Sequence, residues 1–467
     1  MWMGRGRLLG EATLSTTIQA KRNKGVHGSG AARASACLRG CTQVEKGMRG
    51  KLAFGGSAGI TAFFLLILFV GCKGRRPTTI TPEMDVAPEF LVRVLLVNDA
   101  VTCNVKGHSA LNLVWGRGNS EEGAGAIRFS ESEAEIEVAL SGGSITIRGR
   151  EFPGDEMTIS PEKPHIFAVN GQEYRGRIRI VVNPDRASFD AINLIPLEPY
   201  LAGVIGAEMP DYWEPEALEA QTIAARTYCL YIKRRFGVGR SWDIKKTQAH
   251  QVYRGLAGES AQIWNAVNHT LGKVMTCRQI DGSEGIFPAY YSSTCGGHTE
   301  SSRNVFGDSF VPLSGVVCPY CERVARPKFF FWPMVQFGAA EVSKKLVQQY
   351  PKLKEIGDIV EITATEKSEY EGFTRLTRIK VSGSAGRSDF LRAEDLRLTI
   401  DPTGRRLKST IFEIMKLGDN WAFSGGRGYG HGVGMCQCGA QAMARQGKKA
   451  EQILAYYYPG SRIVSVY

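Results

Sequence analysis

The stretch Tyr200–Tyr231, YLAGVIGAEMPDYWEPEALEAQTIAARTYCLY, joins an almost uncharged segment to an amphipathic helical pattern. Its first acidic residue, Glu208, follows an apolar run and precedes Met209 and Pro210. If this carboxyl lies in an apolar cleft, desolvation raises its pKa and lets it act as a general acid near neutral pH. If it lies exposed at the end of a buried strand, it has no chemical role, and the pattern alone favours this second interpretation.

The residues after Glu208 predict a helix over Glu214–Phe236. Pro215 suits a first helical turn, apolar side chains recur at helical spacing, and Gly237 ends the pattern. Further helices are expected at Ala261–Leu271, Ala340–Tyr350 and Ala440–Tyr458.

The residues before this stretch predict strands. Runs rich in β-formers, bounded by Gly, Asn, Asp and Pro, occur at Phe90–Val97, Ala134–Leu140, Ser144–Gly149 and Arg177–Val182. They indicate an antiparallel sheet or barrel-like unit over residues 88–195 that leads into a mixed helical catalytic core over residues 196–467. Strands recur within residues 335–415, at DIVEITA and RLTRIKVSG. The expected fold class is α+β.

Five motifs in one order give the chain a family resemblance. They are LEPYLAGVIGAEMP (Leu197–Pro210), ALEAQTIAARTY (Ala217–Tyr228), HQVYRG (His250–Gly255), YYSSTCGGHTES (Tyr290–Ser301) and GYGHGVGMCQCGAQAMA (Gly428–Ala444). Together they resemble the stage II sporulation protein D family, which includes the LytB-type amidase enhancers, and the resemblance covers roughly residues 88–467. It implies that Glu208, the glutamate of the AEMP motif, is the catalytic acid.

The resemblance implies a lytic transglycosylase that cleaves peptidoglycan between N-acetylmuramic acid and N-acetylglucosamine. Its substrate would be glycan strands stripped of stem peptides, and its products would end in 1,6-anhydro-N-acetylmuramic acid. A lone acid suits this reaction, whereas most glycosidases use two carboxylates. Asp211 and Glu214 are expected to be solvated or helix-capping. The alternative is a non-catalytic wall-binding protein that enhances an N-acetylmuramoyl-L-alanine amidase.

The N-terminal region predicts export. Residues 52–71 are uncharged and mostly apolar, and Arg49 and Lys51 precede them, as in a signal peptide. We expect residues 48–72 to be a signal peptide or membrane anchor, residues 1–47 a disordered upstream extension and residues 73–87 a linker. Cys72 fits a lipidated cysteine, although Phe69 departs from the usual leucine. A transmembrane segment is the rival, and either option places the main domain outside the cytoplasm.

The net charge of +12 does not indicate a nucleic-acid partner. Residues 77–467 carry 45 basic and 44 acidic side chains, so the excess belongs to the N-terminal region. No basic stripe with interleaved aromatic residues remains to follow a phosphate backbone. The expected partners are peptidoglycan glycan strands, a cell-wall amidase in the enhancer alternative, and the membrane through the N-terminal anchor.

Two short cysteine motifs predict a structural zinc site. Cys295 and His298 form one pair and Cys318 and Cys321 the other, which is the spacing of a closed four-ligand site. Disulfides are the alternative outside the cytoplasm. A zinc hydrolase is the weakest functional hypothesis, because a closed site has no open coordination position; we expect no cofactor for catalysis. The family's other metal site, just before the QVY motif, is in doubt because only His250 stands there, so we expect a hydrogen-bonded histidine.

The glycine-rich segment 428–440 supplies further candidates. In the family that the motifs resemble, this segment lies near the catalytic cleft, which implies that His431 and Gln437 contact substrate or orient Glu208; a buried, hydrogen-bonded His431 is equally compatible. Arg226 is a candidate substrate contact or a partner for a structural carboxylate. Ser292 and Ser293, with Thr294, could bond sugar hydroxyls. The remaining cysteines are assigned no ligand role: Cys436 and Cys438 are too close in sequence for an easy mutual disulfide, and Cys229 and Cys277 suit a core.

Overall fold

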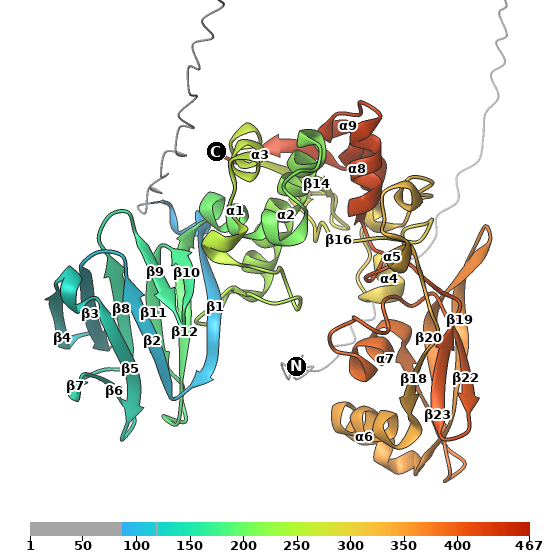
Figure 1. Cartoon of the computed structure of the whole chain (residues 1–467), viewed down its shortest axis with the longest axis horizontal. Helices are drawn as coiled ribbons and strands as arrows, with labels where there is room; N and C mark the ends of the chain where they lie inside the picture. The colour runs from blue at the N-terminus through green and yellow to red at the C-terminus, as the bar shows by residue number, and fades with distance from the viewer. Residues whose placement is uncertain (1–85, 118–119) are drawn as a thin grey trace, which may run out of the picture. The chain divides into compact units, whose positions relative to one another are not determined.

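The computed structural model describes residues 86–117 and 120–467 (Figure 1). The predicted upstream extension, signal peptide or anchor, lipidated Cys72 and most of the linker lie outside these residues. Within the described ranges, no helix is both long and apolar enough to cross a bilayer. The fold is α+β, as expected.

Two antiparallel sheets form the strand-rich part that precedes the helices. One has the strand order β13 (Ile244–Lys245), β1 (Leu91–Ala100), β12 (Phe189–Pro196), β11 (Arg177–Val182), β8 (Glu156–Pro161), β3 (Leu111–Arg117) and β4 (Ser120–Phe129), with β13 alone parallel to its neighbour among these strands. The other has the order β10 (Gln172–Arg175), β9 (Ile166–Val169), β2 (Thr102–Gly107), β5 (Glu135–Ser141), β6 (Ser144–Ile147) and β7 (Arg150–Phe152). The strand predictions are confirmed as β1, β5 and β6, with shifted ends, and as β11, with the predicted ends.

The two sheets share one apolar core (Figure 1). In β11 the isoleucines and the second valine are buried, while the arginines that alternate with them are half-buried. This period of two is what a strand with one face on a core requires. The same core continues into the helices, so the strand-rich part and the helical part are packed together.

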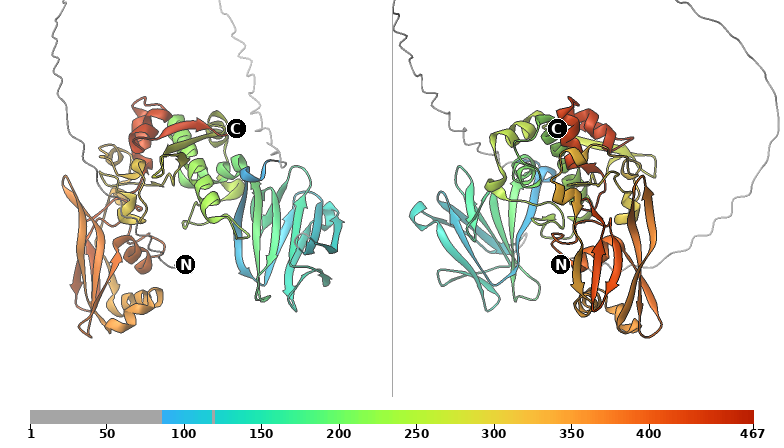
Figure 2. Two further views of the ribbon diagram at one scale, coloured as in Figure 1. Left: turned by 180° about the vertical axis from the view of Figure 1, so that it is seen from behind. Right: turned by 45° about the vertical axis from the view of Figure 1, so that its right-hand side comes forward.

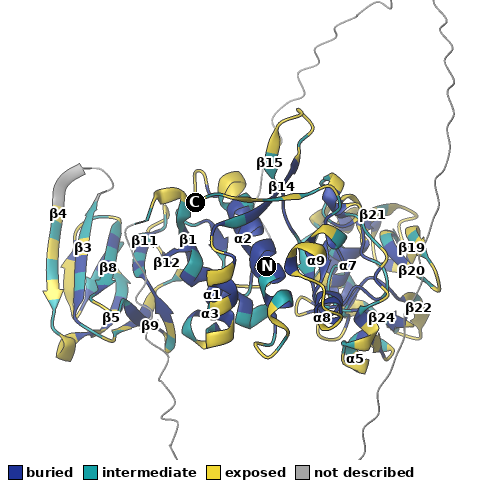
Figure 3. Ribbon diagram, turned by 90° about the horizontal axis from the view of Figure 1, so that it is seen from above, coloured by how far each residue is buried: buried dark blue, intermediate teal, exposed yellow. Residues whose placement is uncertain are grey.

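Helices α1 (Leu197–Glu208) and α2 (Pro215–Phe236) follow β12 directly. Helix α2 matches the predicted helix, and it is dark blue over much of its length in Figure 3 because most of its side chains are buried. Helices α8 (Gln437–Arg445) and α9 (Ala450–Tyr457) contact α2 (Figures 1 and 2). The end of the chain therefore packs against the helix that follows Glu208.

The structure changes two sequence expectations about these helices and confirms two others. The predicted single helix Ala440–Tyr458 is wrong: it is two helices, and Gly447 between them has a φ of 80°, which glycine tolerates far better than other residues. The segment ending at Glu208 is a helix and not a buried strand. The predictions at Ala261–Leu271 and Ala340–Tyr350 are confirmed as α3 (Ala261–His269) and α6 (Ala339–Gln349).

A second apolar core is formed by residues that lie between positions 332 and 423 of the sequence. Its main elements are β18 (Val335–Gly338), α6, β19 (Ile359–Tyr370), β20 (Phe373–Gly383), β21 (Ser388–Arg392), α7 (Ala393–Ile400), β22 (Glu413–Leu417) and β23 (Asn420–Ser424). The predicted strands DIVEITA and RLTRIKVSG are confirmed within β19 and β20. The shorter elements are η3 (Gly255–Gly258), β14 (Lys273–Arg278), β15 (Glu284–Ile286), β16 (Tyr291–Ser292), α4 (Ser302–Val305), η5 (Cys321–Arg323), α5 (Pro327–Phe330), β17 (Phe331–Trp332), β24 (Gly426–Arg427), β25 (Met435–Cys436) and β26 (Arg462–Ser465).

Candidate active site

Glu208 is the last residue of α1, and its side chain is half-buried. Met209 leaves the helix in an extended conformation, and Pro210 follows it. The backbone N–H of Val252 donates a hydrogen bond of 3.1 Å to Oε1 of Glu208. The carboxyl is therefore not fully exposed, in contrast to the interpretation that the sequence pattern alone favours.

A close backbone approach brings Val252 to Glu208. A Cβ atom on Gly206 would lie 2.0 Å from the carbonyl oxygen of Gly258 in η3, which is closer than any side chain allows. Glycine at this position lets α1 and η3 touch through their backbones. The segment 252–258 is held against the end of α1 as a result.

Burial raises the pKa of the Glu208 carboxyl above its ordinary value. The Val252 N–H, the side-chain amide of Gln437 and the charge of Arg254 oppose this shift without cancelling it. The carboxyl thus keeps its proton to a higher pH than a solvated glutamate does. This is the property that a general acid needs near neutral pH.

Two tyrosines lie close enough to Glu208 for its negative charge to raise their pKa values. Burial, reinforced by that charge, raises the pKa values of Tyr228 and Tyr291, so both phenols stay protonated. The Gln251 side chain donates to the Tyr291 hydroxyl at 2.9 Å and accepts from the Tyr200 hydroxyl at 3.0 Å. The sequence alone does not indicate a role for the side chains of Tyr228, Gln251 and Tyr291, although Gln251 and Tyr291 lie in the QVY and YYSST motifs.

Gln437 connects the C-terminal helices to the acid. It is the first residue of α8, is 5% exposed, and hydrogen-bonds the Glu208 carboxyl. Its Nε2 also lies 3.4 Å from Oε1 of Gln221, a fully buried residue of α2. The geometry favours an orienting role for Gln437 over direct contact with substrate.

Both histidine candidates are engaged by backbone groups. His431 accepts at Nδ1 from the Val433 N–H at 3.0 Å, and its ring donates to the Tyr291 carbonyl. Burial lowers the pKa of His431 to about 4, so the ring is neutral near pH 7 and holds the strand beside Glu208 in place. His250 accepts from the Lys245 N–H at 3.1 Å, which agrees with the expected hydrogen-bonded histidine.

Arg226 lies in the protein interior with a carboxylate partner. Its guanidinium is fully buried, pairs with Glu198 at 2.6 Å and donates to the Lys273 carbonyl. The structural alternative for Arg226 therefore fits, and the substrate-contact interpretation does not, because a side chain with no exposed surface cannot reach a glycan.

Ser292 and Ser293 lie on and just after β16, whose neighbour is β25. Ser292 Oγ is buried and has no hydrogen-bond partner among the described residues. Ser293 is half-buried, and its Oγ lies 3.4 Å from the hydroxyl of Thr294. The role of the two serines in binding sugar hydroxyls stays a prediction.

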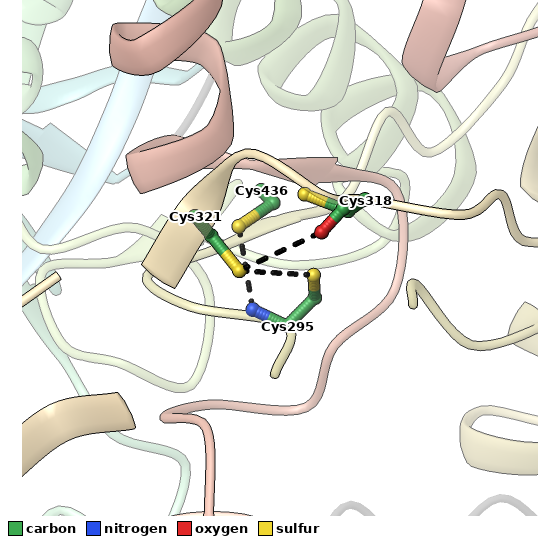
Figure 4. Close-up of side chains that lie close together, drawn as sticks. All are labelled: Cys295, Cys318, Cys321 and Cys436. Carbon is green, nitrogen blue, oxygen red and sulfur yellow. Dashed lines mark hydrogen bonds between the residues drawn. The ribbon is translucent and has the colours of Figure 1, made fainter. Parts of the chain in front are cut away.

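Four cysteines come together next to this strand pair. The sulfur atoms of Cys295, Cys318, Cys321 and Cys436 all lie within 4.8 Å of one another, and all four residues are buried (Figure 4). The predicted ligand His298 is not among them: its Nδ1 lies 2.6 Å from the Thr299 carbonyl and its ring stacks on Tyr370. Cys436 takes its place, a residue that sequence spacing could not connect with the other three.

Comparisons with known proteins agree with the motifs. A family model described as "Stage II sporulation protein" matches residues 185–277, and a domain of unknown function matches residues 322–434. An uncharacterized protein of Brachyspira hyodysenteriae is 33% identical over 64% of this chain and 74% of its own length.

Two relatives from Bacillus subtilis have descriptive names. The protein named amidase enhancer is 28% identical over 70% of this chain, and the match spans half of the relative's length. The protein named stage II sporulation protein D is 30% identical over 66% of this chain and 85% of its own length. The chain therefore belongs to the stage II sporulation protein D family.

Proposed function

We propose that this chain is a peptidoglycan lytic transglycosylase in which Glu208 serves first as the acid and then as the base. The observation that carries the proposal is the half-buried Glu208 carboxyl, whose pKa is raised by burial while one backbone N–H and one amide still reach it. Such a group can be neutral before the reaction and can be stabilised as an anion during it.

The proposed reaction needs only one protein carboxyl. Glu208 gives its proton to the glycosidic oxygen between N-acetylmuramic acid and N-acetylglucosamine, and the bond from this oxygen to the anomeric carbon breaks. The Glu208 carboxylate then takes the proton of the 6-hydroxyl of the same muramic acid, whose oxygen bonds to the anomeric carbon. The product end is a 1,6-anhydro sugar, no water is consumed, and Glu208 is protonated again.

The surroundings of Glu208 support a single-carboxyl mechanism. Asp211 and Glu214, the next acidic residues in the chain, are both exposed. No second carboxylate is among the described groups that shift the pKa of Glu208. A glycosidase with two carboxyls would need a partner within about 10 Å.

The proposal extends to place and substrate. The catalytic part acts outside the cytoplasm, held by a lipid on Cys72 or by residues 52–71, and it acts on glycan strands without stem peptides. The neutral phenols of Tyr228 and Tyr291 are suitable hydrogen-bond partners for a sugar beside Glu208.

The alternative is an enhancer that binds the wall and stimulates an amidase without cleaving glycan. The relative named amidase enhancer supports this alternative. A protein of this kind would keep the same fold, and Glu208 would have no chemical role in it.

One experiment separates the two. The full chain is incubated with denuded glycan strands, and the products are analysed by mass spectrometry for anhydro-muramic ends. We expect these ends from the wild type and from Glu214→Gln, which alters an exposed carboxyl nearby, and none from Glu208→Gln.

A parallel reaction contains intact peptidoglycan and a cell-wall amidase. Amidase stimulation that is equal in the wild type and Glu208→Gln, with no anhydro ends from either, would establish the enhancer and overturn the transglycosylase. Anhydro ends from a folded Glu208→Gln would overturn the assignment of the acid.

A further inference from the structure

The four buried cysteines come from three segments that are distant in the sequence. Cys295 follows β16. Cys318 and Cys321 lie on either side of a Pro-Tyr pair, and Cys321 is the first residue of η5. Cys436 is the last residue of β25 and the N-cap of α8. Figure 4 shows the four side chains converging on one point. None of the cysteines in the described residues forms a disulfide.

The spacing of the sulfur atoms fits a tetrahedral metal site. Zinc–thiolate bonds of about 2.3 Å in a tetrahedron place the sulfur atoms about 3.8 Å apart. Cys295 Sγ and Cys321 Sγ are 3.7 Å apart, and no pair in the group exceeds 4.8 Å. Four soft thiolates in a closed, buried shell favour zinc and leave no open position for catalysis.

Hydrogen-bond donors point at the sulfur atoms, as is usual for metal-bound thiolates. The Cys295 N–H donates to Cys436 Sγ at 3.3 Å, and the Tyr457 hydroxyl lies 3.1 Å from Cys318 Sγ. Helix α8 can come this close because Gly439 has no side chain: a Cβ there would lie 2.8 Å from Cys318 Sγ and 1.9 Å from the Tyr457 hydroxyl.

The cluster adjoins the residues that surround Glu208. Cys436 pairs in parallel with Ser292, and its neighbour Met435 pairs with Tyr291. Gln437, which hydrogen-bonds the Glu208 carboxyl, directly follows Cys436. A metal that fixes Cys436 to Cys295 therefore also fixes the start of α8 and the position of the Gln437 amide.

We propose that Cys295, Cys318, Cys321 and Cys436 bind one structural zinc ion, which holds β16 and β25 together and positions Gln437 against Glu208. His298, which sequence spacing had put in this set, is not a ligand. The assignment of the metal does not depend on the proposed reaction, whereas the effect on glycan cleavage rests on it.

The first test measures metal in the full chain. Inductively coupled plasma mass spectrometry should find about one zinc per chain in the wild type, in His298→Ala and in the matched control Cys438→Ser. Cys438 is two residues from Cys436 and outside the group of four. After dialysis against a competing chelator, Cys436→Ser should hold at most about a tenth of the zinc that the wild type holds. Loss of zinc in His298→Ala, or its retention in Cys436→Ser, would overturn the ligand set.

A second measurement covers the case in which Cys436→Ser does not fold. Cobalt(II) exchanged into the wild type and into His298→Ala should give the same intense thiolate-to-metal charge-transfer bands, indicating four sulfur ligands in both. Peptide mapping under non-reducing conditions provides the opposing result, because disulfides among these four cysteines in a metal-free, folded chain would refute the site.

The positioning role has its own readout. Zinc removal with a chelator from a chain that stays folded should displace the basic limb of the pH–rate profile in the same direction as Gln437→Leu does. An unchanged limb would limit the metal to stabilising the fold. If the wild type holds zinc but cleaves no glycan, the metal site stands and the proposed function fails.

Discussion

The backbone N–H of Val252 donates to Oε1 of Glu208 across 44 residues of sequence. This contact joins the QVY motif to the AEMP motif and favours the ionised form of the carboxyl, whereas burial favours the neutral form. The two effects act at different stages of the proposed reaction. The neutral acid is needed first, and the anion that follows already has a donor in place.

Glu208→Gln should change how stability depends on pH. Because the pKa of Glu208 is raised in the folded protein, the wild type loses free energy of unfolding as pH rises from about 4.5 through the raised value. The glutamine variant cannot ionise, so its stability advantage should be absent near pH 4 and present near pH 8. Urea denaturation at both pH values measures this difference. A difference that stays constant between the two pH values would contradict the buried neutral acid.

Gln437→Leu should move the basic limb of the pH–rate profile to higher pH. The Gln437 amide lowers the pKa of Glu208, so its loss lets the acid keep its proton longer. We also expect kcat at the optimum to fall about tenfold or more, because the carboxyl loses an orienting contact. The control is Gln441→Leu: Gln441 lies one turn further along α8 and bonds the Glu214 N–H instead of Glu208. Equal pH profiles for the two variants would argue against an orienting role.

Arg226→Met should lower stability and leave KM for glycan strands unchanged. The substitution leaves Glu198, whose side chain is 15% exposed, without its ion-pair partner. Breaking a buried pair in this way costs about 3–5 kcal/mol of stability. Urea denaturation gives the free energy of unfolding, and steady-state kinetics on the folded fraction gives KM. Arg234→Met, at an exposed position of α2, should change stability by less than about 0.5 kcal/mol. A raised KM with normal stability would restore Arg226 as a substrate contact.

Gly206→Ala should separate α1 from η3. The new Cβ would lie 2.0 Å from the Gly258 carbonyl oxygen, so one backbone must move, at a cost of about 1–3 kcal/mol. The same movement lengthens the bond from Val252 to Glu208, and glycan cleavage should fall with stability. Thermal unfolding and product analysis measure both effects. Gly338→Ala is the control, because its Cβ would have open space, with the nearest atom at 4.0 Å.

The sequence predicted those helices and strands whose own residues carry the signals of their conformation. Helix α2 has a first-turn proline, helical spacing of apolar residues and a following glycine, and it was found to within one residue. Helix α1 was missed as a helix because its residues from Leu197 to Ile205 are buried on nearly every side and show no polar face. Its conformation is set by packing against β12 and η3, which the sequence of the segment does not display.

The predicted ligand set differs from the cysteine cluster in the structure for a related reason. The spacing of Cys295 and His298 suggested a pair, but the His298 ring stacks on Tyr370, the last residue of β19. Cys436 joins the cluster only because β25 pairs with β16, a contact between segments that are more than 140 residues apart. The motif resemblance identified Glu208 and Gln437, and the fold supplied the contact between them.

The pairing of β16 with β25 also makes the surroundings of Glu208 depend on the segment after residue 427. A nascent chain that has reached residue 427 contains Glu208, Val252 and Tyr291, but it lacks His431, Cys436 and Gln437. The acid would be present without the groups that orient it, and only the final segment closes the site. The contacts that the structure gives to the Glu208 carboxyl are therefore incomplete in any chain that lacks this segment.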